Sequence, residues 1–246
     1  MPRRPGLPVF ILAVALQSTV AWTAGTAAQP DTRPDVWDLA LGSPVAVLPV
    51  RFVDYACGTS GGPPSRLLRG FNEFALCPAD ARGLREVYFR YDDEMEYIAR
   101  ALEQPALIAR FAGTKVFGYP VVASALFDDA GRLRGIRLVT DPRGVTPDER
   151  SDFWTLGTVL RNYFGADGWT CADLPLEAGE EPVGAFLIKT SCGKSDDGLD
   201  FRIEQRYLRR RGHAFIDELT GTVVPGAFES ATIFEMFLAD PASGGG

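Results

Sequence analysis

The sequence predicts an α+β fold, in which a mostly antiparallel sheet built from hairpins carries a few flanking helices and divides into two subdomains. Three observations lead to this prediction. Residues 115–127 and 132–140 are rich in β-branched and aromatic types and are separated by a short turn, which is the pattern of a β-hairpin. Thr146, Pro147 and Glu149 combine residues that are preferred at a helix start. Four cysteines form two groups that are far apart in the chain.

The first 28 residues have the features of a secretory signal peptide. Arg3 and Arg4 give a short positive region, residues 9–16 are an apolar run, and small residues at 24–28 offer a processing site. The apolar run is too short to span a bilayer. We therefore expect the signal to be removed, no transmembrane segment in the mature chain, and a periplasmic or secreted protein.

The N-terminal subdomain, residues 29–144, is expected to contain the hairpin. Asp128 can hydrogen-bond to its own backbone, and Gly131 can take the positive φ that closes a type I turn with a bulge. Apolar residues occur on both faces of the two hairpin strands, which places the hairpin centrally in a sheet. The elements expected before it are helical turns at 36–41 and 43–49, strands at 50–57 and 85–91, and a helix beginning at Asp93.

The C-terminal subdomain, residues 145–246, is expected to open with the helix that Thr146 caps. Apolar residues at helical spacing follow, and Gly165 is a natural stop for this helix. The remainder is expected to form strands at 183–190, 199–208, 214–216, 222–224 and 228–238, with a loop at 192–198 and a flexible tail at 242–246.

The four cysteines predict two disulfides. An even number of cysteines behind an export signal favours disulfides, and the grouping favours Cys57 with Cys77 and Cys171 with Cys192. Each bond would close a loop of about twenty residues, which stabilises the fold by roughly 3 kcal/mol. A zinc site is the alternative, but the chain has no C-x-x-C spacing and a single histidine. We expect no cofactor.

The charge of the chain argues against a nucleic-acid partner. The sequence has 25 basic and 32 acidic side chains, and removal of the signal takes away two arginines, which leaves a net charge of −9. An acidic chain lacks the basic surface that nucleic acids require. Arginines do cluster at Arg132, Arg134 and Arg137 and again at Arg206 and Arg209 to Arg211. We expect a solvated strand face there rather than a patch for an anionic partner.

One segment could carry nucleophilic chemistry. Residues 57–63, CGTSGGP, resemble the nucleophile loop of chymotrypsin-like serine proteases, with Ser60 in the nucleophile position and Thr59 where that family has Asp. The segment also fits the G-x-S-x-G pattern of α/β-hydrolases. A serine needs a neighbouring base, and the only histidine, His213, follows Ser60 by about 150 residues. The order of residues fits a hydrolase, whereas the prolines that follow the loop favour an ordinary surface loop.

An acidic run could bind a cation. Asp92, Asp93, Glu94 and Glu96 provide four carboxylates within five residues, and carboxylates are the usual ligands of calcium. The same residues also form a helix start, with Asp93 as the N-cap and Glu96 completing a capping box. We favour the helix start.

Taken together, these patterns favour an exported, disulfide-containing envelope protein with a binding or accessory role and no enzymatic activity. The partner would be another envelope protein or a small ligand. Two alternatives stay open, a serine hydrolase that uses Ser60 and His213, and a cation-binding protein that uses the acidic run.

Overall fold

The computed structural model describes nine segments of the chain. They are residues 36–49, 52–90, 98–99, 101–106, 114–143, 150–212, 214–216, 223–225 and 228–239. Residues 33–246 belong to one compact unit. None of the helices in the described segments is long and apolar enough to cross a membrane.

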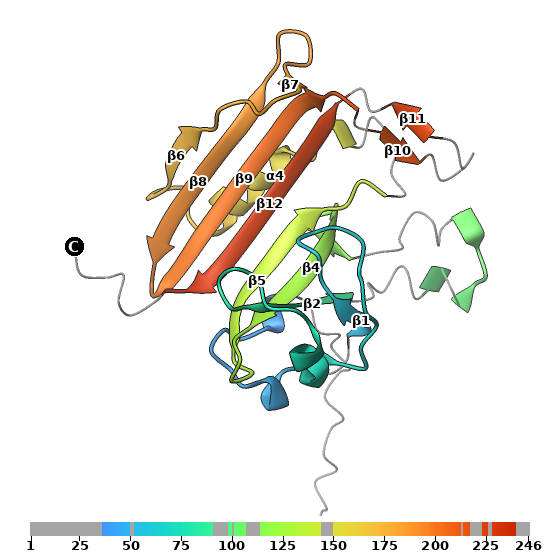
Figure 1. The fold of residues 1–246 in the computed structure, drawn as a ribbon, viewed down its shortest axis with the longest axis vertical. Helices are drawn as coiled ribbons and strands as arrows, with labels where there is room; N and C mark the ends of the chain where they lie inside the picture. The colour runs from blue at the N-terminus through green and yellow to red at the C-terminus, as the bar shows by residue number, and fades with distance from the viewer. Residues whose placement is uncertain are drawn as a thin grey trace, which may run out of the picture. The chain divides into compact units, whose positions relative to one another are not determined.

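In these segments, ten strands form one antiparallel sheet (Figure 1). The main strand order is β1-β2-β4-β5-β12-β9-β8-β6, while β3 pairs with β4 and β7 pairs with β9. A separate two-stranded sheet consists of β10 and β11. The strands are β1 (Val53–Cys57), β2 (Arg85–Arg90), β3 (Lys115–Val116), β4 (Tyr119–Phe127), β5 (Leu133–Thr140), β6 (Thr170–Asp173), β7 (Glu180–Glu181), β8 (Ile188–Asp196), β9 (Leu199–Arg210), β10 (Ala214–Ile216), β11 (Val223–Pro225) and β12 (Glu229–Leu238).

The predicted central hairpin is confirmed as β4 and β5, but the first strand, expected over 115–127, is wrong at its start, because a turn at Phe117 and Gly118 separates β3 from β4. The N–H of Gly131 donates to the carbonyl of Asp128 at 2.9 Å, and the N–H of Arg132 donates to the Asp128 carboxylate at 2.8 Å. Gly131 has a φ of +73°, as the turn requires. Most residues of both strands are buried, because other strands flank the hairpin on both sides and side chains pack on both faces.

The sheet contains strands from both predicted subdomains. β5, from the first half, pairs with β12, from the second half, over Ile233–Phe237, and β12 then pairs with β9 along its whole length. The two halves therefore share one sheet. The fold is predominantly β, with few helices, rather than a balanced α+β fold. Two predicted helix starts, at Asp93 and Thr146, lie outside the described residues.

The hairpin of β8 and β9 differs from its prediction. The loop expected at 192–198 is wrong, because β8 continues to Asp196 and β9 begins at Leu199. Only Asp197 and Gly198 form the turn, with φ values of +48° and +75°. Two successive residues with positive φ match the right-handed twist of the strands, and Asp-Gly is a preferred pair for such a turn.

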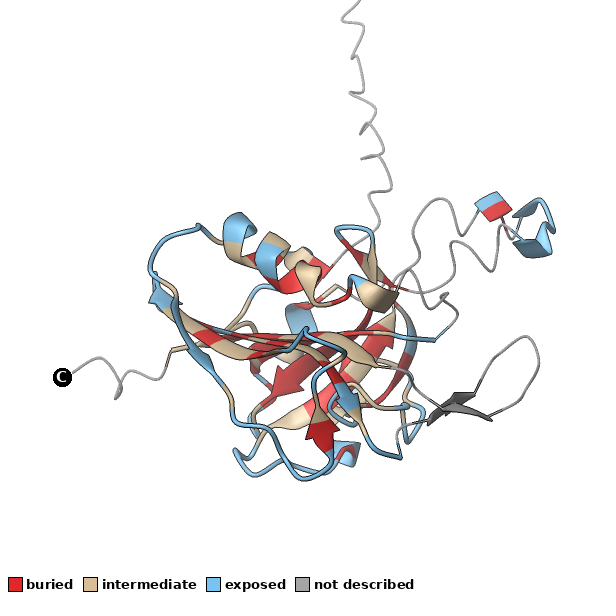
Figure 2. Ribbon diagram, turned by 90° about the horizontal axis from the view of Figure 1, so that it is seen from above, coloured by how far each residue is buried: buried red, intermediate tan, exposed pale blue. Residues whose placement is uncertain are grey.

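Helical segments cover one face of the sheet. The helix α4 (Thr155–Tyr163) buries Leu156 and Leu160 there, and Figure 2 shows the buried residues of the helical segments turned toward the strands. Phe164 continues the apolar stripe and stacks on Phe234 of β12, with ring centroids 5.3 Å apart. Three short 3-10 helices also lie in the described segments, namely η1 (Val36–Asp38), η2 (Val45–Val47) and η3 (Phe71–Leu76).

Both predicted disulfides are confirmed. Cys57 at the end of β1 is bonded to Cys77 after η3, and Cys171 on β6 is bonded to Cys192 on β8. No cysteine of the described residues is free.

Candidate functional site

The face of the sheet opposite α4 carries charged side chains. Successive side chains of a strand point to opposite faces, so on β9 the residues Phe201 and Ile203 pack under the helix while Arg202 and Glu204 point away from it. Paired residues on neighbouring antiparallel strands share a face. We call the surface so defined the charged face, and its members are Glu86, Arg137, Glu180, Lys189, Arg202, Glu204, Arg206, Arg210, Glu229 and Glu235.

The buried centre of the charged face is Arg137 on β5. Its Nε donates to Glu235 Oε1 at 2.9 Å, and its Nη1 donates to Glu86 Oε2 at 2.6 Å. Only 8% of Arg137 is exposed, and Glu86 and Glu235 are 9% and 7% exposed. The predicted solvated strand face is therefore wrong at this residue. Glu86 reaches Arg137 across β4 because β4 carries the small residue Ser124 opposite Arg137.

A loop places Ser60 over this cluster. The backbone N–H of Ser60 donates to Glu86 Oε2 at 2.9 Å, and Arg137 Nη1 donates to Ser60 Oγ at 3.1 Å. The next residue, Gly61, has a φ of +85° and lies so close to the sheet that a Cβ atom would be 2.6 Å from Val139 Cγ2. The Gly58 to Pro64 loop is thus held against the sheet by hydrogen bonds and by a close backbone contact.

A shallow depression of about 190 Å³ opens beside Ser60. Arg202 and Glu204 of β9 line one side, and their side chains are 4.0 Å apart. The Arg202 side chain is 60% exposed, so its charge is available to a ligand. The full lining is Ser60, Arg137, Arg202, Glu204, Ile233 and Glu235. It therefore combines charges of both signs, one hydroxyl group and one apolar side chain.

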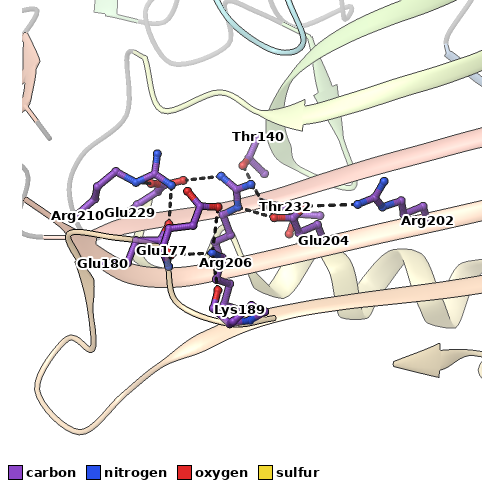
Figure 3. A network of polar contacts seen from close by, with 11 residues as sticks. Thr140, Glu177, Glu180, Lys189, Arg202, Glu204, Arg206, Arg210, Glu229 and Thr232 are labelled. Atoms are coloured by element: carbon purple, nitrogen blue, oxygen red, sulfur yellow. Dashed lines mark hydrogen bonds and ion pairs between the residues drawn. The ribbon is translucent and has the colours of Figure 1, made fainter. Parts of the chain in front are cut away.

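Further along the charged face, Glu180 of β7 is the centre of a second cluster (Figure 3). Its carboxylate accepts hydrogen bonds from Lys189 Nζ at 2.7 Å and from Arg210 Nη2 at 2.6 Å. Burial alone would raise the pKa of Glu180. The Glu177 N–H, which donates at 2.8 Å, and the two cations outweigh burial and lower that pKa from 4.5 to about 2. Lys189 correspondingly has a raised pKa, first because it donates to Glu180.

Ion pairs connect the second cluster to the depression (Figure 3). Arg210 lies 3.7 Å from Glu229, and Arg206 lies 3.3 Å from Glu229 and 2.6 Å from Glu204. Glu204 is the residue that pairs with Arg202 at the depression. Positive and negative side chains therefore alternate along this path.

The sequence-predicted sites have different outcomes. The structure places Ser60 at the depression, but His213 lies outside the described residues, as do Asp92, Asp93, Glu94 and Glu96. The hydrolase and cation-binding hypotheses therefore stay predictions. Within the described residues, no group of three or more histidine, cysteine, aspartate and glutamate side chains could hold a metal ion.

Sequence reasoning missed the Glu86, Arg137 and Glu235 cluster. Its one local signal is an arginine within the apolar segment LRGIRLV, where burial on both faces was expected. A charged side chain in a buried strand requires a partner of opposite charge, and the sequence does not show which strands supply it.

Comparisons with known protein families, with curated proteins and with solved structures found no match. The chemistry of the site is therefore argued from its geometry. The Oγ of Ser60 accepts a hydrogen bond from a guanidinium group, which cannot take up a proton and does not activate a serine nucleophile.

Proposed function

We propose that this chain is an exported, non-enzymatic protein that binds an envelope protein or a small ligand through its charged face. Two disulfides support export, because disulfides persist in oxidising compartments. The observation that carries the binding role is the depression at Ser60, which presents charged and polar groups on a rigid base.

The base is rigid because its charges already have partners. Arg137 is bonded to Glu86 and to Glu235, so these three side chains lose little freedom when a ligand binds. At the edge of the depression, Arg202 can pair with an acceptor while the Glu204 carboxylate can accept from a donor. A ligand that offers both kinds of group fits this arrangement, since complementary charges fix its orientation.

Charge reversal at the edge of the depression tests this proposal. Arg202→Glu is compared with Arg211→Glu, which makes the same change at a side chain that is 80% exposed. Each tagged protein is isolated from exporting cells, and its bound protein or small molecule is quantified by mass spectrometry. We expect Arg202→Glu to lose the ligand that the wild type and Arg211→Glu retain, and equal retention by both variants would overturn the proposal.

One observation favours the serine hydrolase alternative. Ser60 has a φ of +57°, and a non-glycine residue in this region is often held there for function, as in the nucleophile turn of α/β-hydrolases. A fluorophosphonate probe should label the wild type but not Ser60→Ala if this alternative is correct. Absence of labelling on the folded wild type would remove it.

A further inference from the structure

The two disulfides lie in different environments. Cys57 and Cys77 are each 1% exposed and belong to the hydrophobic core. Cys171 is exposed and lies on β6, whose four residues are all exposed. β6 is at the end of the strand order, next to β8 (Figure 1). A dissolved thiol can therefore reach Cys171, whereas the first disulfide is shielded.

A cation contacts both sulfur atoms of the exposed disulfide. Nη1 of Arg161, on α4, lies 3.6 Å from Cys171 Sγ and 3.8 Å from Cys192 Sγ. The other terminal nitrogen donates to Thr158 Oγ1, and the buried Nε has no hydrogen-bond partner. No carboxylate of the described residues forms an ion pair with Arg161. Its charge is thus available to the sulfur atoms, and a neighbouring cation favours a thiolate over a thiol.

The backbone would keep the two cysteines together after the bond opens. Cys171 and Cys192 are direct partners in the β6–β8 register, with Cα atoms 4.0 Å apart. β8 is also paired with β9 from Ile188 to Asp196, so it stays in the sheet without the disulfide. Opening and closing of this bond therefore require no unfolding of the sheet.

We propose that Cys171–Cys192 is a thiol-exchange site for low-molecular-weight thiols, and that Arg161 is the positioning residue that activates it. The proposal is independent of the function of the charged face. A thiolate attacks Cys171 Sγ, a new sulfur–sulfur bond forms there, and the bond to Cys192 breaks. The electron pair of that bond remains on Cys192 Sγ as a thiolate beside Arg161. The attack falls on Cys171 because Cys192 is only 2% exposed.

A second thiol completes the reaction. Its thiolate attacks the incoming sulfur of the mixed disulfide, which releases Cys171 as a thiolate and forms the disulfide of the two small thiols. Two electrons pass from the two small thiols to the protein disulfide. If the Cys192 thiolate is alkylated before the second step, it can no longer attack Cys171 and expel the small thiol, and the protein keeps one small thiol on Cys171.

The test uses the folded mature protein with increasing concentrations of reduced glutathione. Free thiols are alkylated after different times, and the modified cysteines are identified by peptide mass spectrometry. We expect glutathione on Cys171 and an alkylated Cys192, while Cys57 and Cys77 stay bonded. Opening of both disulfides at the same rate, or glutathione on Cys192, would overturn the proposal.

Variants distinguish activation of the Cys171–Cys192 disulfide by Arg161 from the effect of solvent exposure of Cys171 alone. We expect Arg161→Met to slow the opening of the bond severalfold, because a leaving thiol of higher pKa leaves more slowly. The variant should also move the alkylation of reduced Cys192 to higher pH, whereas Arg161→Lys should restore both properties. Arg211→Met removes an exposed cation elsewhere and serves as the control. Opening of Arg161→Met at the wild-type rate, with an unchanged pH profile, would contradict the role of Arg161.

Discussion

Replacement of Arg137 by methionine should destabilise the fold more than any surface substitution of an arginine. Methionine keeps much of the side-chain volume but removes the charge that faces Glu86 and Glu235. The side chains of both glutamates are about nine-tenths buried, and Glu86 Oε1 already lacks a hydrogen-bond partner within the described residues. Removal of one partner from a buried ion pair costs about 3–5 kcal/mol.

That loss is a large share of the total stability, because the unfolding free energy of a domain is about 5–15 kcal/mol. It corresponds to a fall in melting temperature of roughly 6–20 °C for a chain of this size. Urea unfolding of the purified protein, followed by tryptophan fluorescence, gives the difference in unfolding free energy.

Two comparisons make the measurement specific. Arg209→Met removes a half-exposed arginine whose contact with Glu181 is 3.8 Å long, and it should cost less than about 1 kcal/mol. Adding Glu86→Gln and Glu235→Gln to Arg137→Met should recover part of the loss, since the uncompensated charges are then gone. A cost for Arg137→Met no larger than that for Arg209→Met would refute the buried cluster.

Three further outcomes are expected. The depressed pKa of Glu180 means that the contribution of Glu180 to stability is complete above pH 4.5 and is lost as the pH falls through about 2. The unfolding free energy of Glu180→Gln, taken from melting curves at acid pH, should therefore lack about 3 kcal/mol of this pH dependence. Glu181→Gln should match the wild type. Gly157→Ala should lower the melting temperature despite alanine's better helix propensity, because its Cβ would lie 2.6 Å from Gln205 Cδ. Gly198→Ala, at a φ of +75°, should cost about 1 kcal/mol in urea unfolding. An unchanged or raised stability in either glycine variant would contradict the corresponding geometry.

Local signals in the sequence were sufficient to predict the turn of the central hairpin and the two disulfides. Asp128 and Gly131 determine a turn through chemistry that acts within four residues, and each cysteine pair closes a short loop. A local signal was also present at Asp197 and Gly198, whose side-chain types favour a two-residue turn. The polar composition around them suggested a longer loop, and the hairpin of β8 and β9 was consequently misplaced.

The candidate site could not be predicted in the same way, because it depends on pairings between distant segments. Arg137 and Glu235 are 98 residues apart in the sequence, and Arg137 and Glu86 are 51 residues apart. Only the strand order brings their side chains to one face. Ser60 was singled out from its sequence context, but its contact with a guanidinium group depends on the loop folding back over β5.

The central proposal is that the charged face at Ser60 contacts a partner, and site-specific photo-crosslinking in cells that produce the protein tests it most directly. A photoreactive amino acid replaces Ile233, which lines the depression without taking part in its ion pairs, or, as a control, Val47, which is 68% exposed on η2. The account predicts a discrete crosslinked product from position 233 and none from position 47. A product from position 47 alone, or the same product from both positions, would contradict it.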